Sequence, residues 1–140
     1  MKYWLLKTEP NVWSWQDNYK SKLHTAEWDG VRNYQARNNL KKMKKNDLCF
    51  FYHTGDEKKI IGTCKVVKEY FLDKSDKDKK FVSVMIKNEK KFLQPVTLNS
   101  IKQNPFFKDF ILLKQSRLSV LNVDIKYWKK ICKMSNIYQN

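Results

Sequence analysis

The stretch from residue 48 to residue 70 constrains the fold of this chain more than any other. Residues 48–53, LCFFYH, would be apolar on both faces of an extended strand, which is typical of a strand in the centre of a sheet. The polar residues 54–57 predict a hairpin loop, and residues 59–70, KIIGTCKVVKEY, predict the returning strand. Gly62 lies inside that second run and indicates a bulge or a close approach by another backbone. An antiparallel sheet is therefore expected at the core.

Short strands and short helices are predicted around this hairpin. Apolar and β-branched runs predict further strands at 2–7, 81–88 and 116–122. Capping residues followed by apolar residues at helical spacing predict helices at 11–16, 34–44, 97–103 and 124–134. Two polar segments predict loops, 18–27 and the densely charged, solvated 73–80. Together these elements predict an α+β protein, a small, mostly antiparallel β-barrel flanked by short helices, folded as one domain over residues 1–140.

The charge of the chain points to a polyanionic partner. Its 140 residues include 29 Lys and Arg against 14 Asp and Glu, a formal net charge of +15 at pH 7. Such an imbalance attracts nucleic acid most commonly, and an anionic membrane surface less commonly. The lysines are scattered, however, and a lysine-rich and asparagine-rich composition is also typical of chains encoded by an AT-rich genome. Charge alone therefore favours nucleic acid without locating a site.

Several classes of protein lack their usual signals here. The N-terminus does not resemble a signal peptide, and no apolar run reaches the ~20 residues of a membrane span. Three cysteines with no CxxC motif favour a reducing compartment and no zinc site. The two histidines lack neighbours for a metal site or a nucleophile, and no phosphate-binding glycine loop occurs. We expect a non-catalytic binding protein without metal or cofactor, which is a monomer and is located in the cytoplasm (at the nucleoid, or in the nucleus of a eukaryote).

Residues 28–38, WDGVRNYQARN, predict the wall of a binding site. Trp28 precedes an Asp29-Gly30 pair that favours a tight turn. Arginines and carboxamides follow, and these side chains bind base edges and phosphates. The alternative interpretation is structural, because Trp28 could anchor a core and the amides could cap a helix.

Recognition of a single base needs a flat aromatic surface, groups for the base edge and cations for the flanking phosphates. The candidates for the aromatic surface are Trp28, Tyr34 and Tyr52. The candidates for the base edge are Asn33, Gln35 and Asn38. The candidate cations are Lys7, Arg32, Arg37, Arg117 and the lysines of 41–45.

Four pieces of the chain, KYWLLKTEP, EWDGVRNYQARN, FFYH and QSRLSV, resemble the signature blocks of the EVE domain, as found in the thymocyte nuclear protein family. They occur in the family's order and span residues 2–120. The resemblance implies a PUA-like fold, related to the YTH readers of methylated adenine and to ASCH domains. It also implies a pocket for a modified base, often a modified cytosine, in DNA or RNA.

The resemblance also implies a set of site residues. Trp28 lies where YTH domains keep a cage tryptophan, and Lys7 and Thr8 match a strand-end Lys-Ser, with threonine keeping the hydroxyl. The complete set implied for base or ligand binding is Lys7, Thr8, Trp28, Val31, Arg32, Asn33, Gln35, Arg37, Tyr52, His53, Ser116, Arg117 and Ser119.

Some of these residues have structural alternatives. Arg117 could pair with Glu9 or Asp29, because buried charges are usually paired. His53 could be a hydrogen-bonded residue at the end of a strand, and Tyr34 could be buried on the inner face of its helix.

Two other functions stay open. ASCH relatives include an amidohydrolase, and Lys7, Thr8 and Glu9 offer its residue types; alternation along a strand argues against it, because Thr8 would point away from the other two. The second alternative is a generic RNA-binding module, in which surface lysines coat the partner. The reader hypothesis requires an indole at position 28 that lines a cavity.

Overall fold

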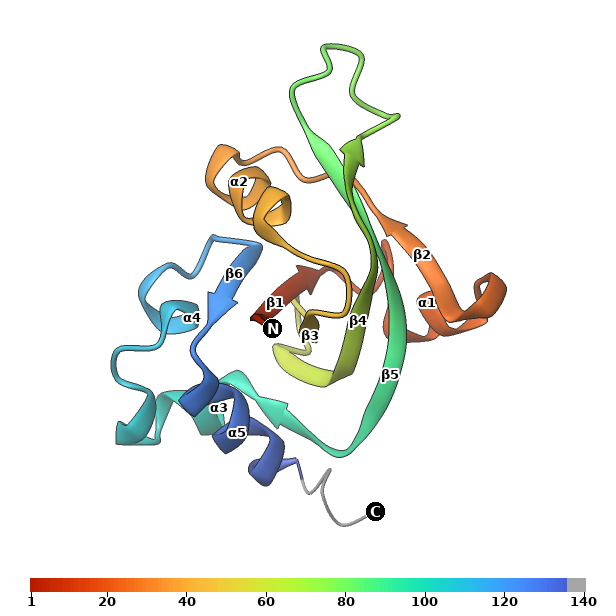
Figure 1. Ribbon diagram of the computed structural model, residues 1–140. Helices are drawn as coiled ribbons and strands as arrows, with labels where there is room; N and C mark the ends of the chain where they lie inside the picture. Colours follow the sequence, from red (N-terminus) through yellow and green to blue (C-terminus); the bar gives the residue numbers. More distant parts are fainter. Residues whose placement is uncertain (136–140) are drawn as a thin grey trace.

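The computed structural model describes residues 1–135 and contains one curled sheet with short helices around it (Figure 1). The six strands are β1 Tyr3–Thr8, β2 Thr25–Trp28, β3 Leu48–His53, β4 Lys59–Leu72, β5 Val82–Thr97 and β6 Val120–Val123. The five α-helices are α1 Trp15–Lys20, α2 Tyr34–Lys42, α3 Leu98–Lys102, α4 Ile111–Lys114 and α5 Ile125–Met134. Two 3-10 turns complete the elements, η1 Lys22–His24 and η2 Pro105–Phe107.

The strands form one mixed sheet in the order β2-β5-β4-β3-β1-β6. The consecutive strands β3, β4 and β5 are joined as antiparallel hairpins, and β2 and β6 also pair antiparallel with their neighbours. The parallel pair is β1 with β3, in which Lys7 lies beside Tyr52 and Thr8 beside His53. A mixed α+β fold with a mostly antiparallel sheet is thus confirmed. The pairing order leaves β2 and β6 as edges, so the closure into a barrel stays a prediction.

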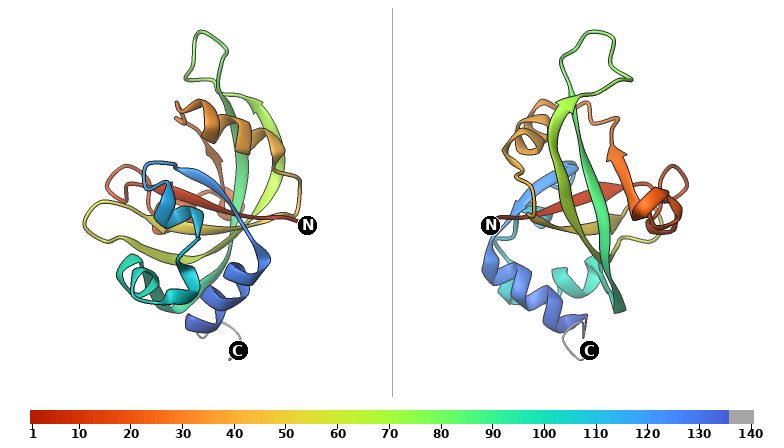
Figure 2. Two further views of the ribbon diagram at one scale, coloured as in Figure 1. Left: turned by 90° about the vertical axis from the view of Figure 1, so that its left-hand side faces the viewer. Right: turned by 45° about the vertical axis from the view of Figure 1, so that its right-hand side comes forward.

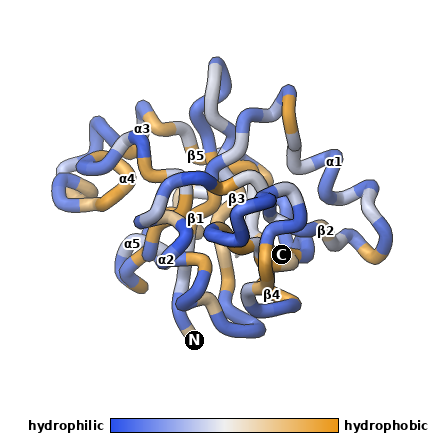
Figure 3. Tube along the Cα trace, turned by 90° about the horizontal axis from the view of Figure 1, so that it is seen from above, coloured by the Kyte–Doolittle hydropathy of each residue, from blue (hydrophilic) through white to orange (hydrophobic). Residues whose placement is uncertain are grey.

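The aromatic side chains of the strands and of α5 pack into a single core. Trp128 of α5 stacks on Phe50 of β3 at a centroid distance of 3.9 Å. Trp15 and Trp28 meet Phe51 edge-on from two directions, at 5.4 and 5.3 Å. Seen from above, apolar segments gather inside and polar segments follow the outer loops (Figure 3).

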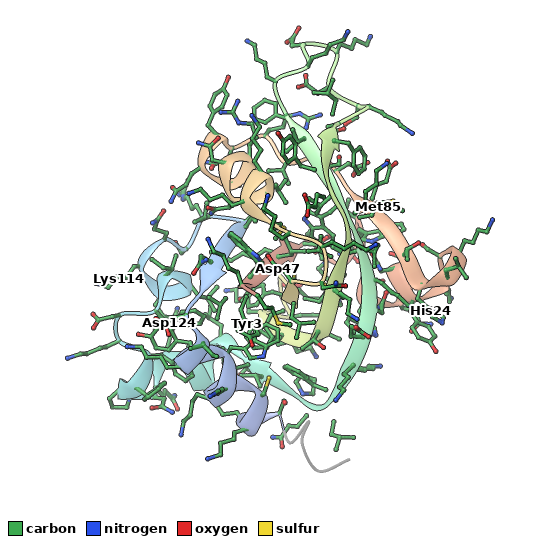
Figure 4. The ribbon with its side chains drawn as sticks, viewed as in Figure 1. Tyr3, His24, Asp47, Met85, Lys114 and Asp124 are labelled. Carbon is green, nitrogen blue, oxygen red and sulfur yellow. The ribbon has the colours of Figure 1, made fainter. Side chains whose placement is uncertain are left out.

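The buried carboxylate of Asp47 anchors the start of β3 (Figure 4). It accepts hydrogen bonds from the Trp4 indole at 3.0 Å and from the backbone N–H groups of Lys44 and Lys2 at 3.0 and 3.1 Å. These bonds tie the loop after α2 to the beginning of β1. A buried carboxylate is tolerated there because each oxygen has a donor.

Gly62 marks a close approach, as the sequence indicates. A Cβ atom at this position would lie 2.8 Å from the Trp15 ring and would also collide with the Lys90 carbonyl oxygen. The register between β4 and β5 shifts beside it, between Ile60 and Gly62. Glycine is therefore required by the space available to the side chain.

The hairpin, α2, α3 and α5 lie close to their predicted positions, and the region before α2 does not. The helix predicted at 11–16 begins instead at Trp15, because Ser14 and Asp17 form a capping box: the Ser14 Oγ accepts from the Asp17 N–H at 3.0 Å, and the Asp17 carboxylate accepts from the Ser14 N–H at 2.9 Å. The predicted loop 18–27 contains the end of α1, η1 and most of β2. The predicted strand 116–122 is shorter, since β6 begins only at Val120.

Within residues 1–135, no helix has both the length and the apolar character needed to cross a membrane.

Candidate nucleobase site

A cavity of about 740 Å³ opens where β1 ends beside β2 and the loop that leads to α2. We call it the β1–β2 cavity. Seven residues of the predicted site line it, namely Lys7, Thr8, Trp28, Val31, Arg32, Asn33 and Ser119. Residues far apart in sequence meet here because β1 lies between β3 and β6 and brings the segment before β6 to the end of its own strand.

The apolar part of the cavity wall is built around Trp28. Its indole is only 6% exposed and packs edge-on against Phe51, yet it also lines the cavity. Trp13, Val12, Ala26 and Val31 add apolar surface. Trp28 is therefore both a core anchor and a cavity wall, so the two interpretations of this residue are not exclusive.

The end of β1 is tied to the segment before β6. The Lys7 ammonium donates to the Ser116 carbonyl oxygen at 2.8 Å, and the Lys7 N–H donates to the Ser119 carbonyl oxygen at 2.8 Å. Partial burial lowers the pKa of Lys7, because a desolvated ammonium is less stable than one in water. The Thr8 hydroxyl donates to the Trp13 carbonyl oxygen at 2.7 Å, which holds the turn after β1 against the strand end.

The rim on the β2 side is held by Asp73. This carboxylate is 2% exposed and accepts from the Gly30 N–H at 2.9 Å, from the Arg32 guanidinium at 2.9 Å and from the N–H and hydroxyl of Ser75 at 2.8 and 2.6 Å. Burial by itself raises the pKa of Asp73, but the hydrogen bonds from Ser75, Arg32 and Gly30 outweigh it and hold the pKa at about 2. The segment 73–80 was expected to be wholly solvated, and Asp73 is the exception, because it neutralises Arg32.

Asn33 joins a structural role to its place on the cavity. Its side-chain oxygen accepts from the Ala36 N–H at 2.9 Å and caps α2, as the structural alternative for the amides predicts. The same residue lines the β1–β2 cavity.

The other two polar residues of this block do not line the cavity. Gln35 is exposed on α2. The Arg37 guanidinium donates to the Asn38 side-chain oxygen and the Lys80 carbonyl oxygen, and lies 4.8 Å from the ring centroid of the exposed Tyr34. Tyr34 is therefore not buried on the inner face of its helix.

Tyr52 and His53 do not line the cavity, although they lie beside Lys7 and Thr8 on the neighbouring strand. Burial raises the pKa of Tyr52 to about 12, and the Lys7 ammonium lies 5.8 Å from its ring centroid. His53 is buried; its Nε2 accepts from the Trp15 N–H at 3.0 Å, and its Nδ1 lies 2.9 Å from a Glu57 oxygen. These bonds fit the predicted alternative of a hydrogen-bonded residue at a strand end.

Ser116 and Arg117 are exposed and also lie outside the cavity lining. No carboxylate among residues 1–135 forms an ion pair with Arg117, so the predicted pairing with Glu9 or Asp29 is wrong. The guanidinium stays in water and needs no partner there.

The structure adds lining residues that the sequence did not single out as ligand-binding, above all Trp13 and Val12. Pro10 carries the available signal, because it forces the chain to leave β1 and fold back over the strand end. Three carboxylates, Glu9, Glu27 and Asp29, complete the lining. No cluster of metal-ligating side chains occurs within the described part of the chain.

The arrangement suits a planar polar ring. Indoles supply a flat apolar surface, carboxylates accept hydrogen bonds from amino groups, and Lys7, Arg32 and Asn33 offer donors at the rim. A heteroaromatic base has these features on its faces and edges.

Comparison with known proteins gives the family. The EVE domain family model matches residues 2–134. Mouse (Mus musculus) thymocyte nuclear protein 1 is 42% identical over 87 residues, which are 55% of this chain and 38% of that protein. The chain thus matches well under half the length of this relative.

Two solved structures cover nearly the whole fold. Rpa0253 from Rhodopseudomonas palustris is 39% identical, with a TM-score of 0.91 over 98% of this chain and 94% of that one. Human THYN1 in complex with 5-methylcytosine-containing DNA is 27% identical, with a TM-score of 0.88 over 96% of this chain and 98% of that one. From the match over residues 2–134, we conclude that the chain belongs to the EVE domain family.

Proposed function

We propose that this protein binds nucleic acid and reads a modified base, of which a methylated cytosine is the first candidate, in the β1–β2 cavity. The observation that carries the proposal is a cavity of about 740 Å³ lined by Trp28 and flanked by donors and acceptors for a base edge. The human relative's complex with 5-methylcytosine DNA supports the choice of base.

In this proposal the base unstacks from its neighbours in the nucleic acid and enters the cavity. It stacks on Trp28 or Trp13, and stacking on an aromatic ring contributes about 1–3 kcal/mol per base. A carboxylate of Glu9, Glu27 or Asp29 accepts the exocyclic amino group, as Asp and Glu do for cytosine. Val31 and Ala26 offer apolar contact to a methyl substituent.

The remaining predicted residues support the site from outside. Arg32 shapes the rim through Asp73, and Tyr52 and His53 support the end of β1 from the neighbouring strand. Gln35, Arg37, Ser116 and Arg117 lie in positions from which they can meet the flanking backbone of the nucleic acid, since they are exposed or half-buried.

The test compares oligonucleotides that differ only in one 5-methyl group. Labelled single-stranded and duplex DNA, with cytosine or 5-methylcytosine at one position, is titrated with the protein at two salt concentrations. We expect tighter binding of the methylated strand, and weaker binding of both strands at high salt, because phosphate contacts release counterions.

Asn33→Asp provides a variant whose fold is retained. Aspartate caps a helix as well as asparagine does, so α2 keeps its cap, while the cavity loses an amide donor and gains a negative charge. We expect loss of the preference for the methylated strand with an unchanged melting temperature. The reader proposal is refuted if the native protein binds methylated and plain strands with equal affinity, in single-stranded and in duplex DNA and at both salt concentrations.

A small hydrolase of modified nucleosides is the second candidate. Lys7, Thr8 and Glu9 all contribute to the cavity lining, and the Thr8 hydroxyl donates to the Trp13 carbonyl oxygen at 2.7 Å. Because β1 ends at Thr8, strand alternation applies to Lys7 and Thr8 but does not decide where the Glu9 side chain points. Incubation with acylated cytidines, followed by mass analysis, detects turnover that Thr8→Val should abolish.

A further inference from the structure

Helix α5 presents a row of lysines on its outer face. Four lysines fall on one face, at the spacing i, i+3, i+4 and i+7, and we call them the α5 lysine face: Lys126, Lys129, Lys130 and Lys133. The opposite face of the helix is buried through Tyr127, Trp128 and Ile131. The buried face fixes the orientation of the helix, so the four lysines remain on its solvent-facing side.

Within residues 1–135 no carboxylate pairs with these charges, and the contacts of Lys126 with the Tyr127 ring and of Lys130 with the Phe106 ring leave both ammonium groups charged. The carboxylate at the helix start, Asp124, accepts from the Lys126 N–H at 3.0 Å as the N-cap (Figure 4). Like charges three and four residues apart repel and weaken a helix. Such a row is complementary to an anionic partner, which would remove this repulsion.

An exposed aromatic ring lies among the same lysines. Phe106 is 46% exposed and lines, with the four lysines, a groove of about 440 Å³. Edge-on contacts to Phe107 at 5.5 Å and Tyr127 at 5.7 Å hold the ring, and the Lys130 ammonium lies 5.8 Å from its centroid. An apolar ring surrounded by cations is the pattern on which unpaired bases stack while their phosphates are neutralised.

We propose that the α5 lysine face is a second nucleic-acid contact, which binds a single-stranded segment with phosphates at the lysines and one base stacked on Phe106. From Lys126 to Lys133 the helix rises about 10 Å, at ~1.5 Å per residue. A groove of this length that carries four cations can follow the backbone of a flexible single strand and meet several of its phosphates.

The other anionic partners fit less well. An amphipathic helix binds membranes by inserting its apolar face, and the apolar face of α5 is already buried in the core. An acidic peptide would neutralise the lysines, but only in a nucleic acid does each charged unit also carry an aromatic ring that can stack on Phe106.

The contact is separate from the β1–β2 cavity. The loop from β2 to α2 lies in the upper half of the molecule, below the loop between β4 and β5, and α5 lies in the lower half, in Figure 1 and in both views of Figure 2. The proposal therefore does not depend on base recognition in the cavity, and the two can fail independently.

The test removes the charge and the ring in separate variants. The probes are fluorescein-labelled, unmodified dT12 and rU12, titrated at several salt concentrations. In the first variant, K126Q/K129Q/K130Q/K133Q, we expect at least a tenfold loss of affinity and a salt slope smaller by about 2 to 3, at ~0.7 per phosphate contact. In the second, Phe106→Leu, we expect roughly a fivefold loss or more with an unchanged slope, because only stacking is removed.

A matched control removes the same charge elsewhere. The quadruple variant K20Q/K22Q/K77Q/K87Q neutralises four exposed lysines of α1, η1, the loop after β4 and β5, none of which lines either proposed site. We expect a loss of affinity below threefold. An equal loss in both quadruple variants would mean that net charge alone matters and would overturn the proposal.

Other outcomes also overturn it. The first is an α5 quadruple variant that binds dT12 with native affinity and native salt slope, and the second is native affinity in Phe106→Leu. The third is binding of polyglutamate or of phosphatidylserine vesicles that depends on α5 and is as tight as that of dT12. The two proposals are tested separately. The α5 quadruple variant should keep the native ratio of affinities for methylated and plain cytosine, whereas Asn33→Asp is expected to change only that ratio.

Discussion

The β1–β2 cavity and the α5 lysine face use positive charge in opposite ways. At the cavity, the Arg32 guanidinium is bound to the buried Asp73, and the Lys7 ammonium is bound to a carbonyl oxygen at 2.8 Å. On α5, four lysines have no ion pair within residues 1–135 and surround a ring that is 46% exposed. The first arrangement fixes a shape, and the second leaves charge available.

This difference separates selectivity from affinity. Paired cations contribute little attraction to a distant phosphate, but they hold the walls against which one base is compared with another. Unpaired cations attract any strand and cannot distinguish bases. The two proposals therefore assign base choice to one end of the molecule and sequence-independent attraction to the other.

Among the tests of the difference between the two regions, we expect the largest change in stability from Asp73→Ala. It leaves the Gly30 N–H and the Arg32 guanidinium without their acceptor at the cavity rim. We expect the free energy of unfolding to fall by about 2–3 kcal/mol, measured by urea denaturation, because removing one partner of a buried hydrogen-bonded pair costs more than the pair contributes. The preference for 5-methylcytosine should fall as well. A native stability would show that the rim is not held as described.

The pH dependence of the unfolding free energy below pH 4 tests the same residue in the native chain. The pKa of Asp73 is about 2 in the folded protein against an ordinary 3.8, so the folded state favours the carboxylate. Its contribution, about 2 kcal/mol from this shift, is present above pH 4 and is lost as the pH falls towards 2. In Asp73→Asn the unfolding free energy should depend less on pH between 4 and 2. An identical pH dependence in the two proteins would assign the loss of stability below pH 4 to other carboxylates.

A smaller effect is expected when the cap of α2 is removed. Asn33→Ala removes the acceptor of the Ala36 N–H, and the loss of such a cap costs about 1 kcal/mol. Asn33→Asp, which keeps an acceptor, is the control and should melt with the native protein. Destabilisation by both variants would mean that the amide group itself, not the cap, is needed.

The smallest effect is expected at α5 and has the opposite sign. Lys→Gln changes at all four positions of the α5 lysine face remove like-charge pairs at spacings of three and four residues and keep helix propensity. We expect the melting temperature to stay equal or to rise, and the free energy of unfolding to increase by at most about 1 kcal/mol. A clear loss of stability would show that these lysines have structural partners, and the comparison between the two regions would fail.

The predictable parts of the fold are those decided by near neighbours in sequence. The β3–β4 hairpin, the cap of α2 at Asn33 and the cap of α5 at Asp124 follow from turn, periodicity and capping rules that act within a few residues. Gly62 was also identified, because a glycine inside a strand pattern signals restricted space. In contrast, β2 was missed, since the four residues TAEW form a strand only by pairing with β5 far along the chain.

The same division holds for the candidate site. The segment 28–33 and the pair Lys7-Thr8 carry recognisable residue types, and the structure places them around one cavity. Trp13 could not be assigned, because its place depends on how the chain turns back after Pro10. The lack of an ion pair at Arg117 and the burial of Asp73 could not be foreseen either, because they depend on whether a distant loop reaches the same charge.

The sequence by itself determined the family, the mixed α+β class, the excess of positive charge and seven of the residues that line the cavity. These properties reside in composition and in short runs of residues. The tertiary structure alone decided which cations are neutralised and which stay free, since an arginine and an aspartate 41 residues apart pair only when the sheet brings their loops together. The result is a cavity whose rim cation is paired with Asp73 and, at the other end of the molecule, a lysine face without ion pairs within residues 1–135.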